Sequence, residues 1–415
     1  MKEPVYAAAR EAIDERAHQS LSDLETLAGI NSGSRNIAGV TAMSDAAAAL
    51  FTGLGAECTR ETLPQWERVD DDGEAVAEPL GPLVRLRRHV PGAPSVLLVG
   101  HTDTVFPADH PFQQVWREGE RLRGPGVADL KGGLVVMRDA LRALEESELA
   151  GRIGWEVLLN PDEEIGSPGS APALDEAARR HDLGLVFEPS LPDGTLAGAR
   201  RGSGNWTAVF HGRAAHAGRE HHLGRNAVVA AARFIARIDA LNGVRDGVTV
   251  NPAFVRGGGP TNVVPDRAVV RLNVRVTSTA DGDWVAREIE AARREVDAPP
   301  GYVVTLHGGF SRPPKPMTPA LETLFEAVRR CGEAVGEEVS WQATGGCCDG
   351  NNLAAAGLPN VDTLGVVGGG IHSADEYMEI PSLGRRAALV ATLLLGLARG
   401  DIDWPNVRET GTEEG

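Results

Sequence analysis

Short apolar runs alternate with helical patterns along the first two hundred residues. Val96–Val99 is an uninterrupted apolar run before Gly100, which is typical of a strand covered on both faces. The runs Ile153–Asn160 and Leu183–Phe187 have the same character, and apolar residues recur at helical spacing between Leu130 and Leu144. The pattern predicts an α/β fold whose sheet has helices on both faces.

The pattern changes after about residue 200. A strand, a helix, two strands, a helix and a strand follow in that order: Asn205–Arg213, Asn226–Leu241, Val248–Val255, Asp266–Val276, Asp283–Val296 and Tyr302–Leu306. This β-α-β-β-α-β order is that of the split βαβ sandwich. It predicts a ferredoxin-like α+β domain, residues 200–313, inserted into a discontinuous first domain of residues 1–199 and 314–415.

The predicted first domain is completed by elements at both ends of the chain. A second N-terminal helix is expected over Ser44–Leu54, a later helix over Leu321–Val335 and a strand near Val361–Val367. The longest apolar run, Ala387–Ala398, is too short to span a bilayer and predicts a buried helix.

Composition and charge narrow the class of protein. The 415 residues are 42% hydrophobic and 24% charged, which is ordinary for a soluble globular protein. The formal charge of 41 − 58 = −17 argues against nucleic acid as a partner and leaves carboxylates available for cations. Four cysteines do not form a disulfide framework at this length, and the charged N-terminus does not resemble a signal peptide. We therefore expect a reduced, cytoplasmic protein without a membrane partner.

Polar residues recur where the predicted strands end. His101 and Asp103 follow the first strand, Glu163 and Glu164 follow the second, and Glu188 follows the third. In open α/β sheets ligands bind beyond the carboxyl ends of the strands. His101 with Asp103 could be a metal ligand and its hydrogen-bonded partner, or a histidine satisfied by a neighbouring carboxylate.

The glutamate pair also has two interpretations. Consecutive side chains leave the backbone in different directions, so one carboxylate could bind a metal while the other acts as a general base. An acidic surface turn is the alternative. Asp129 stands at a predicted helix N-terminus, where a helix cap is the common explanation. The repetition of the pattern at several strand ends favours a functional site.

Five motifs in order give the chain a recognisable character. They are HTDTVFP, GPGVADLKGG, NPDEEIGSPGS, the glutamate of VFEPS and the histidine of GGGIHSADEY. The sequence resembles the co-catalytic di-zinc amidohydrolases and exopeptidases that include glutamate carboxypeptidase, acetylornithine deacetylase, succinyl-diaminopimelate desuccinylase and aminoacylase. The resemblance spans nearly the whole chain and is strongest to the bacterial glutamate carboxypeptidases. It implies a zinc-exopeptidase-like catalytic domain with a mixed sheet between two helical layers, and an inserted lid or dimerisation domain.

The resemblance also implies a set of metal ligands. His101 and Glu188 would bind one zinc ion, Glu164 and His372 the other, and Asp129 would bridge the two. Imidazoles and carboxylates without a thiolate suit Zn²⁺, with Co²⁺ or Mn²⁺ as substitutes.

Further roles follow from the same resemblance. Asp103 would orient His101, and Glu163 would be the general base for a metal-bridging water. A cis peptide would join Asp129 to Leu130.

The predicted inserted domain carries three more candidates. His216 matches a family histidine that stabilises the oxyanion, often from the partner subunit, which implies a homodimer formed through this domain. Asn262 and Arg275 match positions that hold the substrate carboxylate, for which a guanidinium is well suited. His216 could instead be a locally satisfied loop histidine, and Arg275 an exposed strand residue.

Two features separate the chain from many relatives. Cys347 and Cys348 occupy a loop that often reads GGTDA, and they could be buried small residues, metal ligands or a redox switch. A basic residue selecting a glutamate side chain is not evident, although Arg200, Arg201 and Arg312 are candidates.

The expected activity is metal-dependent hydrolysis of the amide bond of an N-acyl-amino acid, or of the C-terminal amino acid of a short peptide. An N-carbamoyl-amino-acid hydrolase and a catalytically silent metal-dependent binding protein are the alternatives. The acyl group, the side chain accepted and the metal used in the cell are not determined by the sequence.

Overall fold

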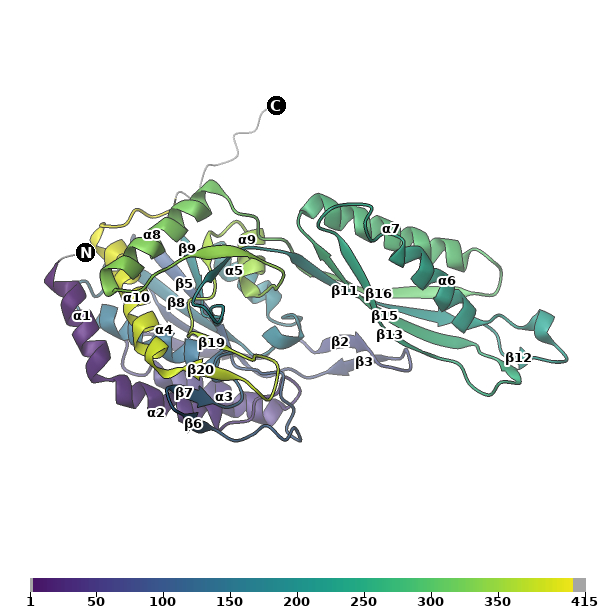
Figure 1. The fold of residues 1–415 in the computed structure, drawn as a ribbon, viewed down its shortest axis with the longest axis horizontal. Helices are drawn as coiled ribbons and strands as arrows, with labels where there is room; N and C mark the ends of the chain where they lie inside the picture. Colours follow the sequence, from purple (N-terminus) through teal and green to yellow (C-terminus); the bar gives the residue numbers. More distant parts are fainter. Residues whose placement is uncertain (1–2, 406–415) are drawn as a thin grey trace, which may run out of the picture.

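The computed structural model describes residues 3–405, and its larger sheet has six strands (Figure 1). These strands are β1 (Glu57–Glu61), β4 (Leu83–Arg88), β5 (Ser95–His101), β8 (Gly154–Asn160), β9 (Leu183–Val186) and β18 (Asn360–Val361). Their order across the sheet is β1-β4-β8-β5-β9-β18. β8, β5, β9 and β18 are parallel, whereas β4 and β1 are antiparallel to their neighbours. The predicted mixed sheet is confirmed.

Helices cover both faces of this sheet. They are α1 (Pro4–Glu15), α2 (Ala17–Ala28), α3 (Ile37–Leu50), α4 (Lys131–Glu145), α5 (Ala171–Ala178), α8 (Pro319–Val335), α9 (Asp349–Ala355) and α10 (Ile380–Arg399). Val96 and Leu98 of β5 belong to one core cluster, with α1, α2, α3, α4, α8 and α10. Leu97 and Val99 belong to the opposite cluster, with α5 and α9. Alternate residues of the strand therefore face the two helical layers, as its continuous apolar run predicts.

A second sheet of four antiparallel strands lies beside the first (Figure 1). Its strands are β11 (Gly202–His211), β13 (Thr249–Gly257), β15 (Arg267–Val276) and β16 (Val303–Arg312). The strand order is β13-β15-β11-β16, and α6 (Ala227–Asp239) and α7 (Thr279–Asp297) pack with the sheet in a separate core cluster. The chain order of these elements is that of the split βαβ sandwich. The domain boundaries at residues 200 and 313 stay a prediction.

Short strands complete the described chain. They are β2 (Trp66–Val69), β3 (Ala75–Glu78), β6 (Trp116–Glu118), β7 (Arg121–Arg123), β10 (Leu196–Arg200), β12 (Ala215–His216), β14 (Val263–Val264), β17 (Trp341–Thr344), β19 (Gly368–Gly369) and β20 (Tyr377–Glu379). Two 3₁₀ turns, η1 (Glu163–Ile165) and η2 (His221–Leu223), lie between them.

The β2–β3 hairpin reaches the four-stranded sheet (Figure 1). Acidic side chains at its tip pair with arginines of that sheet: Asp71 with Arg271 at 2.7 Å, Asp72 with Arg256 at 2.9 Å and Glu74 with Arg267 at 2.6 Å. The hairpin therefore connects the two sheets through charged contacts.

The predicted strand over Val361–Val367 is wrong for most of its length. Pairing with β9 ends at Val361, because Asp362 turns to Arg200 and Lys315 and Thr363 has φ = 67°. A buried ion pair with two cations thus replaces continued strand pairing.

Two predicted helices have different limits from those expected. α3 begins at Ile37 rather than Ser44, because the Asn36 side chain accepts a hydrogen bond from the Gly39 amide and caps the helix. α10 spans 20 residues and is long and apolar enough to cross a membrane, but 78% of its apolar window is buried. We therefore assign α10 to the core.

Candidate metal centre

His101 ends β5 and has a carboxylate on one side of its ring. Its Nδ1 lies 3.0 Å from the Asp103 carbonyl oxygen and 3.3 Å from Asp103 Oδ1. The Asp103 carboxylate also accepts hydrogen bonds from the backbone amides of Glu163 (3.1 Å) and Glu164 (3.2 Å) and from Ser34 Oγ (2.7 Å). Asp103 therefore holds both the imidazole and the turn that carries the two glutamates.

Asp129 lies between two imidazoles. Its Oδ1 is 3.2 Å from His101 Nε2, and its Oδ2 is 3.2 Å from His372 Nε2. His372 Nε2 is also 3.2 Å from Glu164 Oε2, and His101 Nε2 is 3.8 Å from Glu188 Oε1. Each oxygen of Asp129 therefore faces a different histidine, with a further glutamate beyond each.

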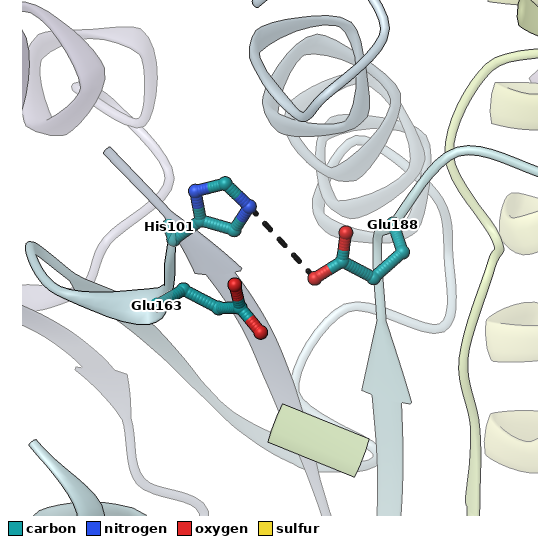
Figure 2. Close-up of side chains that lie close together, drawn as sticks. All are labelled: His101, Glu163 and Glu188. Carbon is teal, nitrogen blue, oxygen red and sulfur yellow. Dashed lines mark ion pairs between the residues drawn. The ribbon is translucent and has the colours of Figure 1, made fainter. Parts of the chain in front are cut away.

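The cluster offers donors suitable for cations. Ligand atoms of His101, Glu163 and Glu188 lie within 4.8 Å of one another, and so do those of His101, Asp129 and Glu164. Figure 2 shows the Glu163 carboxylate directed into the space between His101 and Glu188. Glu188 Oε1 is buried and receives no hydrogen bond from any residue between 3 and 405. An orphaned buried carboxylate oxygen beside two imidazoles and further carboxylates fits a divalent cation.

Buried negative charge dominates the electrostatics. Burial raises the pKa of Glu164 to about 7, with a further contribution from Asp129, and burial also raises the pKa of Glu163 and Glu188. Hydrogen bonds with Asp129 and Glu164 raise the pKa of His372 to about 11. The carboxylates resist ionising together and the imidazole retains a proton, so binding of a cation would relieve the repulsion and release protons.

The loop that carries Asp129 is held by a residue that the sequence analysis did not identify. The Glu376 carboxylate accepts hydrogen bonds from the amides of Gly126 (3.0 Å), Ala128 (3.0 Å) and Asp129 (3.1 Å). A cis peptide joins Asp129 to Leu130, as the resemblance implies. Glu376 lies within the last motif, GGGIHSADEY, but nothing in the sequence distinguishes it from a surface carboxylate.

A cavity of about 350 Å³ opens from the cluster. Its other walls include Arg200, Thr344, Cys347, Cys348 and Ser190. The volume lies within the range of small-molecule sites. Arg200 Nε donates to Asp362 Oδ2 at 2.8 Å, and Lys315 Nζ donates to the same oxygen at 2.8 Å. Two cations share one carboxylate, so the buried group of Arg200, Lys315 and Asp362 adds a net positive charge beside this wall.

Three residues singled out from the sequence, Arg275, Cys348 and Arg201, can be placed relative to this cavity. Arg275 of β15 reaches the rim of the cavity, with Nη1 3.1 Å from Cys347 Sγ and Nε 3.0 Å from Asn273 Oδ1. Burial raises the pKa of the Cys348 thiol well above its usual range, which disfavours the thiolate that a metal would bind. Arg201 does not line this cavity.

His216 and Asn262 lie together but away from the cluster. His216 is in β12, at the far end of the four-stranded sheet from the cluster (Figure 1). The Asn262 carbonyl accepts a hydrogen bond from the Ala217 amide at 2.9 Å. His216 Nδ1 accepts from the Gly218 and Arg219 amides at 3.2 Å each. Their predicted roles stay predictions, since neither lines the cavity within one chain.

Comparison with known proteins gives consistent sequence matches. Residues 97–396 match peptidase family M20/M25/M40. The chain is 30% identical over 389 residues to carboxypeptidase G2 of Pseudomonas sp. (strain RS-16), covering 92% of this chain and 89% of that protein. It is 32% identical over 310 residues to succinyl-diaminopimelate desuccinylase of Gluconobacter oxydans, covering 70% of this chain and 78% of that protein.

Solved structures share the fold. Aminopeptidase PepT from Bacillus cereus superposes with a TM-score of 0.70 at 23% identity, covering 92% of this chain and 99% of that chain. The metallo-carboxypeptidase Sso-CP2 from Sulfolobus solfataricus gives a TM-score of 0.70 at 17% identity, with the same coverages.

Proposed function

Because the chain belongs to peptidase family M20/M25/M40 and is a hydrolase of peptide or related amide bonds, we propose that it releases an amino acid with a free carboxylate from an N-acyl-amino acid or a short peptide. Carboxypeptidase G2 and the desuccinylase both have names consistent with such substrates.

One arrangement supports the proposal most strongly. Asp129 lies between His101 and His372, and the cavity beside them also contains Glu163 and a cationic wall. Donors for cations, a spare carboxylate and a positive surface thus meet in one cavity. Amide hydrolysis needs these features to activate water, polarise the carbonyl and hold an anionic substrate.

The ligand set fits two zinc ions, with Co²⁺ or Mn²⁺ as substitutes. His101 and Glu188 would hold one ion, Glu164 and His372 the other, and Asp129 both. Three anionic ligands against two dications leave a net positive centre. When bound, the ions would supply Lewis acidity toward the substrate carbonyl and lower the pKa of water.

The chain's own residues would position the substrate and move the proton. Glu163 would accept a proton from the attacking water and deliver it to the leaving nitrogen as the carbon–nitrogen bond breaks. Arg275 would bind the free carboxylate at the rim of the cavity, and Arg200 would add positive charge to its wall. Asp103 would keep His101 oriented toward the cluster.

A homodimer is part of the proposal. His216 and Asn262 are far from the cluster of their own chain, so roles in catalysis would require them to enter the cavity of a partner subunit. Pairing through the four-stranded sheet and its helices would place them there.

The test is amino-acid release from a panel of N-acyl-amino acids, N-carbamoyl-amino acids and dipeptides. Purified protein is assayed with Zn²⁺, Co²⁺ or Mn²⁺, and again after chelation, with metal content measured in each sample. We expect release from N-acyl or peptide substrates that chelation abolishes and metal restores. Release only from carbamoyl substrates would reassign the substrate class. No release from a protein with two bound metals would favour a binding protein and contradict the proposal.

A further inference from the structure

Arg312 is a buried cation beside Glu163. It is the last residue of β16 and is 3% exposed. It pairs with Ser203 of β11, and Pro313 follows it as the chain returns to the larger sheet. The residue therefore lies where the four-stranded sheet joins the part of the chain that carries the candidate metal centre.

The two ends of its guanidinium have different partners. Nη2 donates to Glu163 Oε1 at 2.8 Å and to Ser167 Oγ at 2.9 Å. Nη1 donates to Asp349 Oδ1 at 2.5 Å and to Asn352 Oδ1 at 2.6 Å. One rigid, planar group thus joins β16, the turn of Glu163 and α9.

These contacts leave Arg312 poorly suited to bind substrate. Asp349 is itself 1% exposed and accepts hydrogen bonds from Ser167 Oγ (2.7 Å) and Asn160 Nδ2, which fix it beside the guanidinium. Two carboxylates, Asp349 and Glu163, already share the charge of Arg312. Selection of an acidic substrate side chain by Arg312 is therefore not favoured.

The same contacts suit a positioning role. The Glu163 side chain has several rotatable bonds and stands on a 3₁₀ turn followed by Gly166 at φ = 93°. Oε1 is held by Arg312, whereas Oε2 has no hydrogen-bond partner among the residues described. Arg312 thus fixes one oxygen of a carboxylate that lies beside His101 and Glu188 (Figure 2).

We propose that Arg312 is a positioning residue that fixes the Glu163 carboxylate for proton transfer and ties its orientation to the four-stranded sheet. The inference rests on the proposed function, in which Glu163 is the general base. Arg312 acts through Glu163 and touches neither substrate nor metal.

The experiment compares wild type, Arg312→Lys and Arg312→Ala on a substrate that the wild type cleaves. We expect kcat to fall about 10- to 100-fold in both variants, because a mispositioned base costs that much. KM should stay within roughly threefold and metal content should be unchanged, since the substrate and metal contacts remain. Guanidinium ion at millimolar concentration should raise the kcat of Arg312→Ala several-fold and leave wild type and Arg312→Lys unaffected.

Arg293→Ala is the matched control. Arg293 of α7 also pairs with two carboxylates, those of Glu290 and Asp297, but lies on the surface away from the cluster. This variant should keep wild-type kcat.

Other results would overturn the inference. An unchanged kcat in Arg312→Lys would show that the fork-shaped guanidinium is not needed. A raised KM with unchanged kcat would assign Arg312 to substrate binding. Loss of metal, with no recovery of kcat on addition of guanidinium ion, would show that Arg312 has only a structural role. If Arg312→Ala does not fold, Arg312→Lys alone decides between these outcomes. A wild type inactive on every substrate would instead refute the proposed function, and this inference with it.

Discussion

Glu163 and Glu164 are neighbours in the chain, yet their side chains have different surroundings. Glu164 Oε2 lies 3.2 Å from His372 Nε2, among the candidate ligands. Glu163 Oε1 lies 2.8 Å from Arg312 Nη2, and its backbone is held by Asp103. The 3₁₀ turn separates the two carboxylates, so one suits metal binding and the other proton transfer.

Replacing Glu163 tests this division of roles. We expect Glu163→Gln to keep two metals per chain and to lose at least about 100-fold in kcat, the usual scale for a general base. Metal analysis and steady-state kinetics on the same preparation provide the measurement. Glu164→Gln is the matched variant and should lose metal. A fully active Glu163→Gln would show that another group accepts the proton.

The sequence indicated the residues of the cluster better than the residues that hold them in place. His101, Asp129 and His372 stand in short motifs whose spacing is local, so their chemistry is visible in the sequence. Arg312 and Glu376 act on residues 149 and 247 or more positions away. Such contacts depend on how strands and loops meet in the fold, which neither periodicity nor local motifs encode.

Among the elements, β8 carries a buried charge whose effect can be measured. Glu156 is fully buried. Burial alone would raise its pKa, but a hydrogen bond with His181 and the charges of His181, Arg85 and Arg180 lower that pKa to about 2. The folded protein thus holds this proton less tightly than the unfolded chain. The stabilisation that the ionised Glu156 gives to the folded protein is present above pH 4.5 and is lost as the pH falls toward 2.

Glu156→Gln should therefore change how stability depends on pH. The pKa difference corresponds to roughly 3 kcal/mol of unfolding free energy at neutral pH. We expect the variant to be less stable than wild type by about that amount at pH 6, and the gap to narrow by pH 3. Urea unfolding at both pH values measures it. A gap that is constant with pH would show that the glutamate charge is not the cause.

Helix α4 packs so closely against the backbone before Glu188 that there is no room for a side chain at Gly133. A Cβ on Gly133 would lie 2.1 Å from the carbonyl oxygen of Phe187, the residue before Glu188. We expect Gly133→Ala to cost about 1–3 kcal/mol of unfolding free energy through overpacking, and to weaken metal binding by displacing Glu188. Chemical unfolding and metal titration measure the two effects.

Gly384→Ala in α10 provides the control for helix propensity. A Cβ there would meet its nearest neighbour, Ile13, at 4.0 Å. This variant should be more stable than wild type by about 0.5–1 kcal/mol. If both alanines stabilised the protein equally, the close approach of α4 to Phe187 would be wrong.

At the element level the sequence predicted strands and helices where periodicity was unbroken. The six elements predicted between residues 202 and 312 occur in the predicted order, although their ends are displaced and the short β12, η2 and β14 lie between them. The strand expected over Val361–Val367 was wrong because Asp362 forms ion pairs with Arg200 and Lys315 instead. An apolar run identifies a buried segment but not whether it stays in the sheet.

Across the whole molecule, the two sheets meet through charged contacts as well as through the chain crossings. The hairpin pairs Asp71 with Arg271 and Glu74 with Arg267, and a cavity of about 640 Å³ lies beside it. This cavity is larger than the one at the candidate metal centre. None of the residues of that centre lines it: His101, Asp129, Glu163, Glu164, Glu188 and His372. Size alone would therefore indicate a different cavity from the one that the chemistry of the lining residues favours as the candidate site.

The largest-scale prediction concerns His216, which cannot serve the cluster of its own chain in this arrangement. If a symmetric dimer exchanges these histidines, each active site uses Glu163 of one chain and His216 of the other. A heterodimer of Glu163→Gln and His216→Ala chains then contains one intact site and one doubly altered site. Purified through two different tags, it should recover about half of the wild-type rate per dimer.

Both parent homodimers should be nearly inactive in the same assay, and a heterodimer of two differently tagged His216→Ala chains controls for the tags. Light scattering at the assay concentration measures whether the chain is dimeric. A heterodimer no more active than its parents would place His216 outside the shared site. Full activity in a monomer would show that a histidine from a partner subunit is not needed.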